Sequence, residues 1–133
     1  MEVTIRHLDG LRFEAATRGH RVLCDQPPAN HGTDSGMTPP EFLLVSLGTC
    51  AAFYAAEYLK ARSLECPGLE IRVSAEKALQ PARLASFRIE VFAPGLDPRH
   101  EAGIHRSVEK CLIHNTLLSP PAIETVIRTA VAA

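Results

Sequence analysis

Apolar and polar residues alternate along the first quarter of the chain, which is the pattern of strands with one solvated face. Two runs place an apolar side chain at every second position: Val3 and Ile5, then Leu11, Phe13 and Ala15. Between these runs, Asp9-Gly10 is typical of a tight hairpin turn. A third short strand is expected from His20 to Asp25. Residues 26–38 are rich in Pro, Gly, Asn, Asp and Ser, and this composition indicates a loop.

The next segment predicts a helix from Thr38 to about Arg62. Thr38 suits the N-cap, Pro39 suits the first helical position, and Glu41 follows Thr38 by three residues, which completes a capping box. Between Phe42 and Leu47, apolar residues point to every side of the helix. We therefore expect protein to surround this helix on all sides.

Two longer alternating runs follow a break at Pro67-Gly68. Apolar residues alternate with polar or charged ones from Leu69 to Glu76, and again from Ala85 to Val91. A turn near Gln80-Pro81 separates the runs. The pattern predicts two strands, each with one solvated face, joined as a hairpin.

A second helix is expected to begin at Asp97-Pro98, with Asp97 as its N-cap. Its apolar residues fall at spacings of four, three and one and form one stripe: Ile104, Val108, Cys111 and Leu112. Cys111 is therefore expected to face inward. After a turn at Pro120-Pro121, the pattern predicts a last strand from Ile123 to Val131.

The order of these elements predicts an α+β fold with a mainly antiparallel sheet around a buried central helix, because strands and helices do not alternate regularly. Residues 1–133 are expected to form a single domain, since the chain shows no internal repeat and its length suits one core. A helix that is apolar on all sides is hard to bury in so short a chain. A homodimer that shares its core would bury it.

Composition and charge restrict the possible partners and location. The chain is 46% hydrophobic and 22% charged, with a formal net charge of −1, so neither nucleic acid nor an anionic membrane is expected as a partner. The first ten residues read as a strand and not as a signal peptide. The longest apolar stretch, within residues 42–56, is interrupted by Ser46, Gly48 and Thr49, and we expect it to be too short and mixed to span a bilayer. A cytoplasmic location follows as the default.

The chain has four cysteines: Cys24, Cys50, Cys66 and Cys111. In a reducing compartment they should not form a structural disulfide framework, and without a C-x-x-C pair their spacing gives little support for a zinc site. A single buried cysteine is usually an inert core residue. Two buried cysteines together allow another interpretation. Cys50 on the central helix and Cys111 on the inner stripe could meet and exchange between dithiol and disulfide.

Three segments carry a resemblance to a known family. These are TPPEFLLVSLGTCAA (38–52), AEK (75–77) and KCLIHNTL (110–117). The chain resembles the OsmC/Ohr family of osmotically inducible and organic-hydroperoxide-resistance proteins over nearly its whole length. The resemblance implies the OsmC-like fold and an intertwined homodimer, and it implies no cofactor.

The resemblance further implies a thiol peroxidase. Cys50 falls at the position of the peroxidatic cysteine and Cys111 at that of the resolving cysteine. A thiolate attacks the O–O bond and becomes a sulfenic acid, the second thiol condenses with it to a disulfide, and a dithiol reductant resets the pair. An apolar wall would favour organic hydroperoxides over hydrogen peroxide. The candidates for that wall, each of which also suits a plain core position, are Phe42, Leu47, Phe53 and Tyr54.

The Cys50 thiolate needs stabilisation, since Cys50 lies about three turns into its helix and an apolar setting raises a thiol pKa. The resemblance implies an arginine from the N-terminal strands, and Arg18 and Arg21 both lie in that region. It also implies a glutamate near the start of the central helix to hold the arginine. Pro40 occupies the aligned position, while Glu41 is one residue away and is explained as the capping partner.

Other departures favour the broader OsmC-like branch. Leu112 replaces the proline expected after the second cysteine. His114 could assist thiol chemistry, or it could bond to backbone carbonyls left without partners at a helix end. Cys24 and Cys66 lie outside the family motifs. The alternative function is a non-catalytic protein that binds a small apolar ligand or senses redox state through its cysteines. A purely structural role has no positive support in the sequence.

Overall fold

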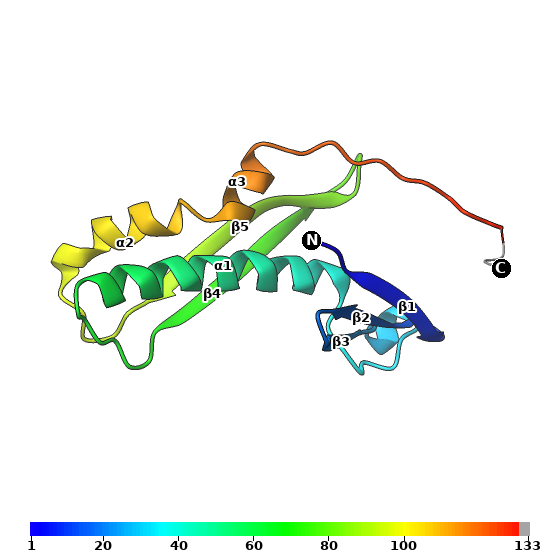
Figure 1. Ribbon diagram of the computed structural model, residues 1–133, viewed down its shortest axis with the longest axis horizontal. Helices are drawn as coiled ribbons and strands as arrows, with labels where there is room; N and C mark the ends of the chain where they lie inside the picture. Colours follow the sequence, from blue (N-terminus) through cyan, green and yellow to red (C-terminus); the bar gives the residue numbers. More distant parts are fainter. Residues whose placement is uncertain (131–133) are drawn as a thin grey trace.

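In the computed structural model, which describes residues 1–130, the chain begins with a three-stranded antiparallel sheet near the start of the long helix (Figure 1). Its strands, in order, are β1 (Thr4–Asp9), β2 (Arg12–Thr17) and β3 (His20–Cys24). The expected first hairpin is confirmed, with Asp9 paired to Arg12 and Gly10 at a φ of 48° in the turn. Glycine accepts this positive φ without a steric cost.

Asp25 organises the loop between β3 and the long helix. Its side chain has no exposed surface. It accepts hydrogen bonds of 2.6 to 3.2 Å from the N–H and hydroxyl groups of both Thr33 and Ser35, and one of 2.7 Å from the N–H of Gln26. The bonds from Thr33 and Ser35, more than the others, hold the pKa of Asp25 far below its usual range. An ionised carboxylate therefore holds the predicted loop in one conformation.

Helix α1 (Pro39–Ala61) starts at the predicted capping box. The N–H of Thr38 donates to Glu41 Oε1 at 2.9 Å, and the N–H of Glu41 donates to Thr38 Oγ1 at 3.5 Å. Pro39 occupies the first helical position, as predicted. The helix ends one residue before Arg62, which serves as its C-cap.

Strands β4 (Glu70–Ala78) and β5 (Arg83–Phe92) form the second predicted hairpin, which is a separate two-stranded sheet. Helix α1 packs along β4. The approach is close at Gly48, where an added Cβ would lie 2.9 Å from a methyl carbon of Val73. Residue 48 is therefore restricted to glycine by the distance between the helix and the strand.

The second predicted helix is broken in the structure. A short 3-10 turn (Pro98–His100), capped by Asp97, leads into α2 (Glu101–Val108), and a separate helix α3 (Leu112–Leu118) follows. Cys111 lies between the helices with an extended backbone, at φ −54° and ψ 129°. It is fully buried as expected, but Leu112 is 63% exposed, so placing Leu112 on the inner stripe was wrong. A change of direction at Cys111 turns the next residue out of the stripe.

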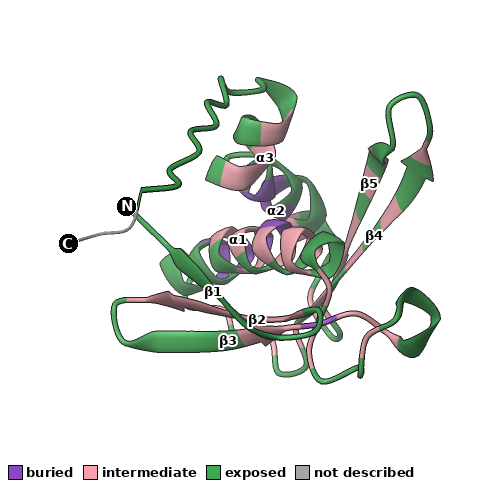
Figure 2. Cartoon of the chain, turned by 90° about the vertical axis from the view of Figure 1, so that its right-hand side faces the viewer, coloured by how far each residue is buried: buried purple, intermediate pink, exposed green. Residues whose placement is uncertain are grey.

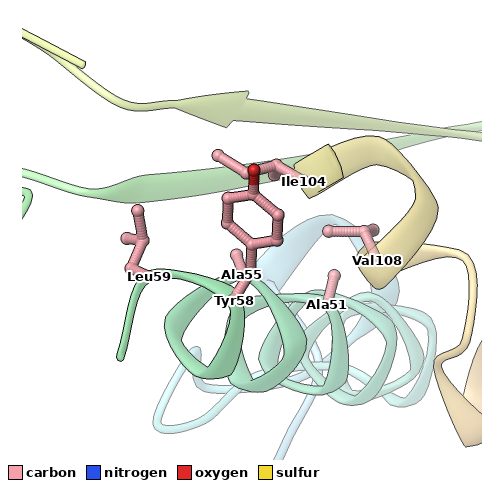
Figure 3. Close-up of a cluster of buried hydrophobic side chains, with 6 residues drawn as sticks. All are labelled: Ala51, Ala55, Tyr58, Leu59, Ile104 and Val108. Carbon is pink, nitrogen blue, oxygen red and sulfur yellow. The ribbon is translucent and has the colours of Figure 1, made fainter. Parts of the chain in front are cut away.

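The core lies where α1 meets α2 against the β4–β5 hairpin (Figure 3). The buried side chains drawn there are Ala51, Ala55, Tyr58, Leu59, Ile104 and Val108. Half-buried residues of the hairpin pack beneath them, among them Ile71, Ile89 and Val91. Small residues allow the helices to approach: an added Cβ on Gly103 would lie 2.5 Å from the Tyr58 ring.

Helix α1 is not surrounded by protein in the single chain, contrary to the expectation from its composition. Leu47 and Ala51 are buried, whereas Val45 is 41% and Phe53 58% exposed. Figure 2 shows buried residues on the side of α1 that faces α2. One chain supplies packing layers for only part of the helix surface, and an apolar face of α1 remains uncovered.

By length and composition, α1 could cross a membrane, since it has 23 residues and a stretch with a mean hydropathy of 1.5. The expectation that this segment is too short and mixed for that was therefore wrong. In the structure, however, α1 packs against β4, α2 and α3, as core helices do.

The predicted last strand is absent from the described residues. From residue 121 to residue 129 the chain has no regular secondary structure, and it leads away from α3 (Figure 1). Ile123 and Ile127 are 87% and 79% exposed. Alternation alone cannot form a strand, because the backbone needs an adjacent edge to pair with, and the described part of the chain offers none there. Val131, the end of the predicted strand, lies outside the described residues.

Candidate functional site

The structure brings Cys50 and Cys111 together. Cys50 lies in the middle of α1 and is half-buried, while Cys111 is buried at the start of α3, and both are free thiols. The Cys111 side chain lies near enough to Cys50 to lower the pKa of Cys50. Two cysteines far apart in the sequence are therefore neighbours in the fold.

Backbone N–H groups of α3 complete the surroundings of the two sulfurs. The N–H of His114 donates to the Cys111 sulfur at 3.4 Å, so that Cys111 caps the helix with its side chain. The N–H groups of Ile113 and Leu112 lie near Cys50 and lower its pKa. These first amides of a helix have no carbonyl partners within it.

The two thiols differ in acidity. Partial burial raises the pKa of Cys50, but the hydrogen bonds from Cys111, Ile113 and Leu112 together outweigh burial and hold the pKa below its ordinary value. Burial raises the pKa of Cys111, and donation of its proton to Cys50 raises it further. Of the two thiols, Cys50 is therefore the one that loses its proton at the lower pH.

An apolar groove of about 510 Å³ is lined by Leu47 and His114, each three residues from one of the two cysteines, although neither cysteine lines it. Leu47 of α1, one turn before Cys50, forms part of its wall, and His114 adds a polar ring. The remaining lining residues come from β5 and α3: Leu84, Ala85, Ser86, Phe87, Ile89, Leu117 and Leu118. The groove could hold a small apolar molecule near the thiols.

The model of the OsmC-like protein family matches residues 32–126, which include both cysteines. The chain belongs to the OsmC-like family. The same residues carry the resemblance noted from the sequence, and the predicted OsmC-like α+β fold is confirmed.

Solved structures share this OsmC-like fold at low sequence identity. An OsmC-like protein from Mycoplasma pneumoniae is 20% identical and superimposes with a TM-score of 0.74, over 90% of this chain and 87% of that one. A protein from Psychrobacter arcticus 273-4, whose name connects it with osmotic stress and detoxification, is 19% identical with a TM-score of 0.77, over 86% and 85% of the two chains.

A third similar structure carries a name related to redox chemistry. It is an organic hydroperoxide resistance protein OsmC from Legionella pneumophila, also described as a predicted redox protein. It is 11% identical, with a TM-score of 0.61 over 88% of this chain and 89% of that one. No curated protein matches this chain in sequence.

Neither arginine suggested by the OsmC/Ohr resemblance contributes to the low pKa of Cys50. Arg18 lies in the turn between β2 and β3, and Arg21 on β3 faces Glu14 at 3.8 Å and is largely exposed. Within residues 1–130, the groups that lower the Cys50 pKa are a thiol and two amides, with no cation among them. Glu41 is held in the capping box.

The other expected residues are spread over the molecule. Of the wall candidates, Leu47 lines the groove beside the thiols, while Phe42 lines a different groove under β1–β3. Tyr54 stacks edge-on against the exposed Phe53 at 5.2 Å. Cys24 borders the groove under β1–β3, and Cys66 donates to the carbonyl of Pro94 at 3.7 Å.

Sequence reasoning missed the amides of Leu112 and Ile113. The stretch from Ile104 to Leu118 contains neither Gly nor Pro, so no local signal marks the break that aims these amides at Cys50. In the described residues, no group of three or more His, Cys, Asp or Glu side chains is placed to hold a metal ion.

Proposed function

We propose that this OsmC-like protein is a thiol-dependent hydroperoxide reductase, with Cys50 as the peroxidatic and Cys111 as the resolving cysteine. The observation that supports it most is that the fold places Cys111, at the start of α3, next to Cys50 on α1, where it lowers the pKa of Cys50. A thiolate is the nucleophilic form of cysteine, and a second thiol next to it can form a disulfide with it.

The reaction balances with these two residues and one reductant. The Cys50 thiolate attacks an oxygen of ROOH, an S–O bond forms, the O–O bond breaks, and RO⁻ takes a proton to leave as ROH. The Cys111 sulfur then attacks the sulfenic acid of Cys50, which releases water and leaves a disulfide. An external dithiol reduces this disulfide to two thiols and is itself oxidised.

The groove beside the thiols supports an organic hydroperoxide as substrate. Its wall is formed largely by aliphatic and aromatic side chains, such as Leu47, Phe87 and Leu117. An alkyl or aryl group would gain from burial there, whereas hydrogen peroxide carries no apolar part to bury. We therefore expect higher kcat/KM for cumene hydroperoxide than for hydrogen peroxide.

A cytoplasmic homodimer is part of the same proposal. The apolar groove of about 500 Å³ between the inner face of β1–β3 and the start of α1 is open in the single chain. Phe53 on α1 and Ile127 in the C-terminal segment are exposed as well. A second copy would cover such surfaces, and sedimentation analysis at micromolar concentration should give twice the mass of one chain.

The test is consumption of cumene hydroperoxide with dithiothreitol as reductant. The unaltered protein should turn over, and Cys50→Ser should reduce turnover to the uncatalysed background, because a serine hydroxyl stays protonated at neutral pH. Cys66→Ser is the matched control, since Cys66 is also half-buried but bonds only to a carbonyl. It should keep full turnover.

Two results would contradict the proposal. Full activity in Cys50→Ser would refute the nucleophile. No turnover in the unaltered protein, together with slow alkylation of Cys50 at pH 7, would favour the alternative of a non-catalytic protein that binds a small apolar ligand.

A further inference from the structure

A polar groove of about 470 Å³ lies on the outer face of the β1–β3 sheet. Successive residues of a strand point to opposite faces, and Ile5, Ala15 and Val22 line the apolar groove against α1. Their neighbours along the strands therefore face outward, and four of these line the polar groove: Thr4, Arg6, Ala16 and Arg21. The β2–β3 turn and the N-terminal residues form the rest of its wall.

Positive charge gathers in this groove. Its lining includes one carboxylate, that of Glu2, and four basic side chains: Arg6, Arg18, His20 and Arg21. Neither of the two apolar grooves is lined by an arginine or a lysine. Because the whole chain has a formal net charge of −1, the excess of positive charge in the groove is a local feature.

Two of the arginines in the groove have no acidic partner. Within residues 1–130, Arg6 and Arg18 form no ion pair, and Arg21 faces Glu14, beside the groove, at 3.8 Å. Other arginines of the chain lie closer to a carboxylate: Arg12, Arg72, Arg88 and Arg99. The guanidinium groups of Arg6 and Arg18 are therefore available to a ligand that brings negative charge.

The backbone at Arg18 is unusual for an arginine. Arg18 and Gly19 form the two-residue turn between the paired residues Thr17 and His20, with φ values of 49° and 81°. Turns of this kind favour Asn, Asp or Gly, because both central residues need a positive φ. Most other side chains adopt that conformation at a cost in free energy. The turn itself therefore does not explain an arginine here, whereas the charge that Arg18 adds to the groove does.

We propose that this groove binds a small anion with two linked phosphate groups, such as pyrophosphate or the diphosphate of a nucleotide. A guanidinium presents paired N–H donors that match two oxygens of a phosphate. Arg6 and Arg21 belong to β1 and β3, which β2 holds roughly 10 Å apart, so their side chains suit an anion longer than a single phosphate. The Thr17 hydroxyl donates to the Glu2 carbonyl at 2.8 Å and fixes the N-terminal wall.

The experiment titrates the protein with pyrophosphate at low ionic strength and follows the backbone amides of residues 17–21 by NMR. These amides should shift, and the shifts give Kd. Arg18→Asn removes one guanidinium and inserts a residue that suits the turn. Its Kd should rise about tenfold, the effect of losing one hydrogen bond to a charged group, while the melting temperature stays the same or rises. Arg88→Gln is the matched control, because Arg88 is an exposed arginine outside the groove, and it should leave Kd unchanged.

Several results would overturn the proposal. These are amides that do not shift at millimolar pyrophosphate, an unchanged Kd in Arg18→Asn, and equal weakening in Arg88→Gln, which would show attraction by net charge alone. Inorganic phosphate that binds as tightly as pyrophosphate would contradict the need for two phosphate groups. Tighter binding of ADP than of pyrophosphate would support a nucleotide as the ligand, and weaker binding would support the free diphosphate. Cys50→Ser should keep the Kd of the unaltered protein, because the site is separate from the proposed reductase activity.

Discussion

Asp25 and Cys50 are both acidic groups whose pKa is lowered by neighbouring N–H groups and side chains, but to different ends. Asp25 is fully buried and accepts five hydrogen bonds from one loop. Cys50 is half-buried, and the groups that lower its pKa lie around the start of α3.

The difference teaches what makes a stabilised anion reactive. Both carboxylate oxygens of Asp25 accept from donors close in sequence, so its charge holds the loop. Cys50 lies one turn from Leu47, which lines an apolar groove, and the groups that lower its pKa belong to a distant part of the chain. We therefore expect substitution of Asp25 to change the stability of the fold, and substitution of Cys50 or Cys111 to change activity.

The largest effect is expected for Cys111→Ser. The variant keeps Cys50, so a first oxidation by cumene hydroperoxide should proceed. Without the resolving thiol, no intramolecular disulfide can form, and excess peroxide should convert Cys50 to sulfinic acid. Mass spectrometry of the Cys50 peptide measures this product, and its absence after prolonged exposure would contradict the role of Cys111. Thermal stability should change far less than activity.

The reverse effect is expected for Asp25→Asn. The new amide places an N–H₂ donor against the hydroxyl and N–H donors of Thr33 and Ser35, so the melting temperature should fall by several degrees. Peroxide turnover below the melting temperature should persist. Asp34→Asn, an exposed position in the same loop, is the control and should leave the melting temperature unchanged.

The same carboxylate predicts a pH dependence of stability. The pKa of Asp25 is depressed in the folded state, so its contribution is complete above the unfolded-state pKa of about 4 and is lost as the pH falls below it. The difference in melting temperature between the unaltered protein and Asp25→Asn should therefore shrink from pH 6 to pH 3. A constant difference would show that the ionised form is not what stabilises the loop.

The smallest effect is expected at the exposed cap of α1. Thr38→Ala removes the side chain that accepts the Glu41 N–H, and loss of such a cap costs about 1 kcal/mol in the free energy of unfolding. Urea unfolding measures this change. Thr38→Ser, which keeps the hydroxyl, should recover most of it, and equal loss in both variants would show that the hydroxyl is not the stabilising group.

Local patterns in the sequence determined much of this protein. The turn at Asp9-Gly10, the capping box from Thr38 to Glu41 and the two hairpins could be predicted because each depends on residues that are close together in the chain. The inward position of Cys111 could be predicted for the same reason, from helical spacing.

Only the tertiary structure decided how the thiols are arranged. The break before α3 has no Gly or Pro to mark it, and it places Cys111 next to Cys50 on another helix. The exposed face of α1 and the unpaired segment after α3 likewise depend on which surfaces are available to pack against. A sequence pattern records what each segment prefers, whereas hydrogen bonds and burial between distant segments are determined by how the whole chain folds.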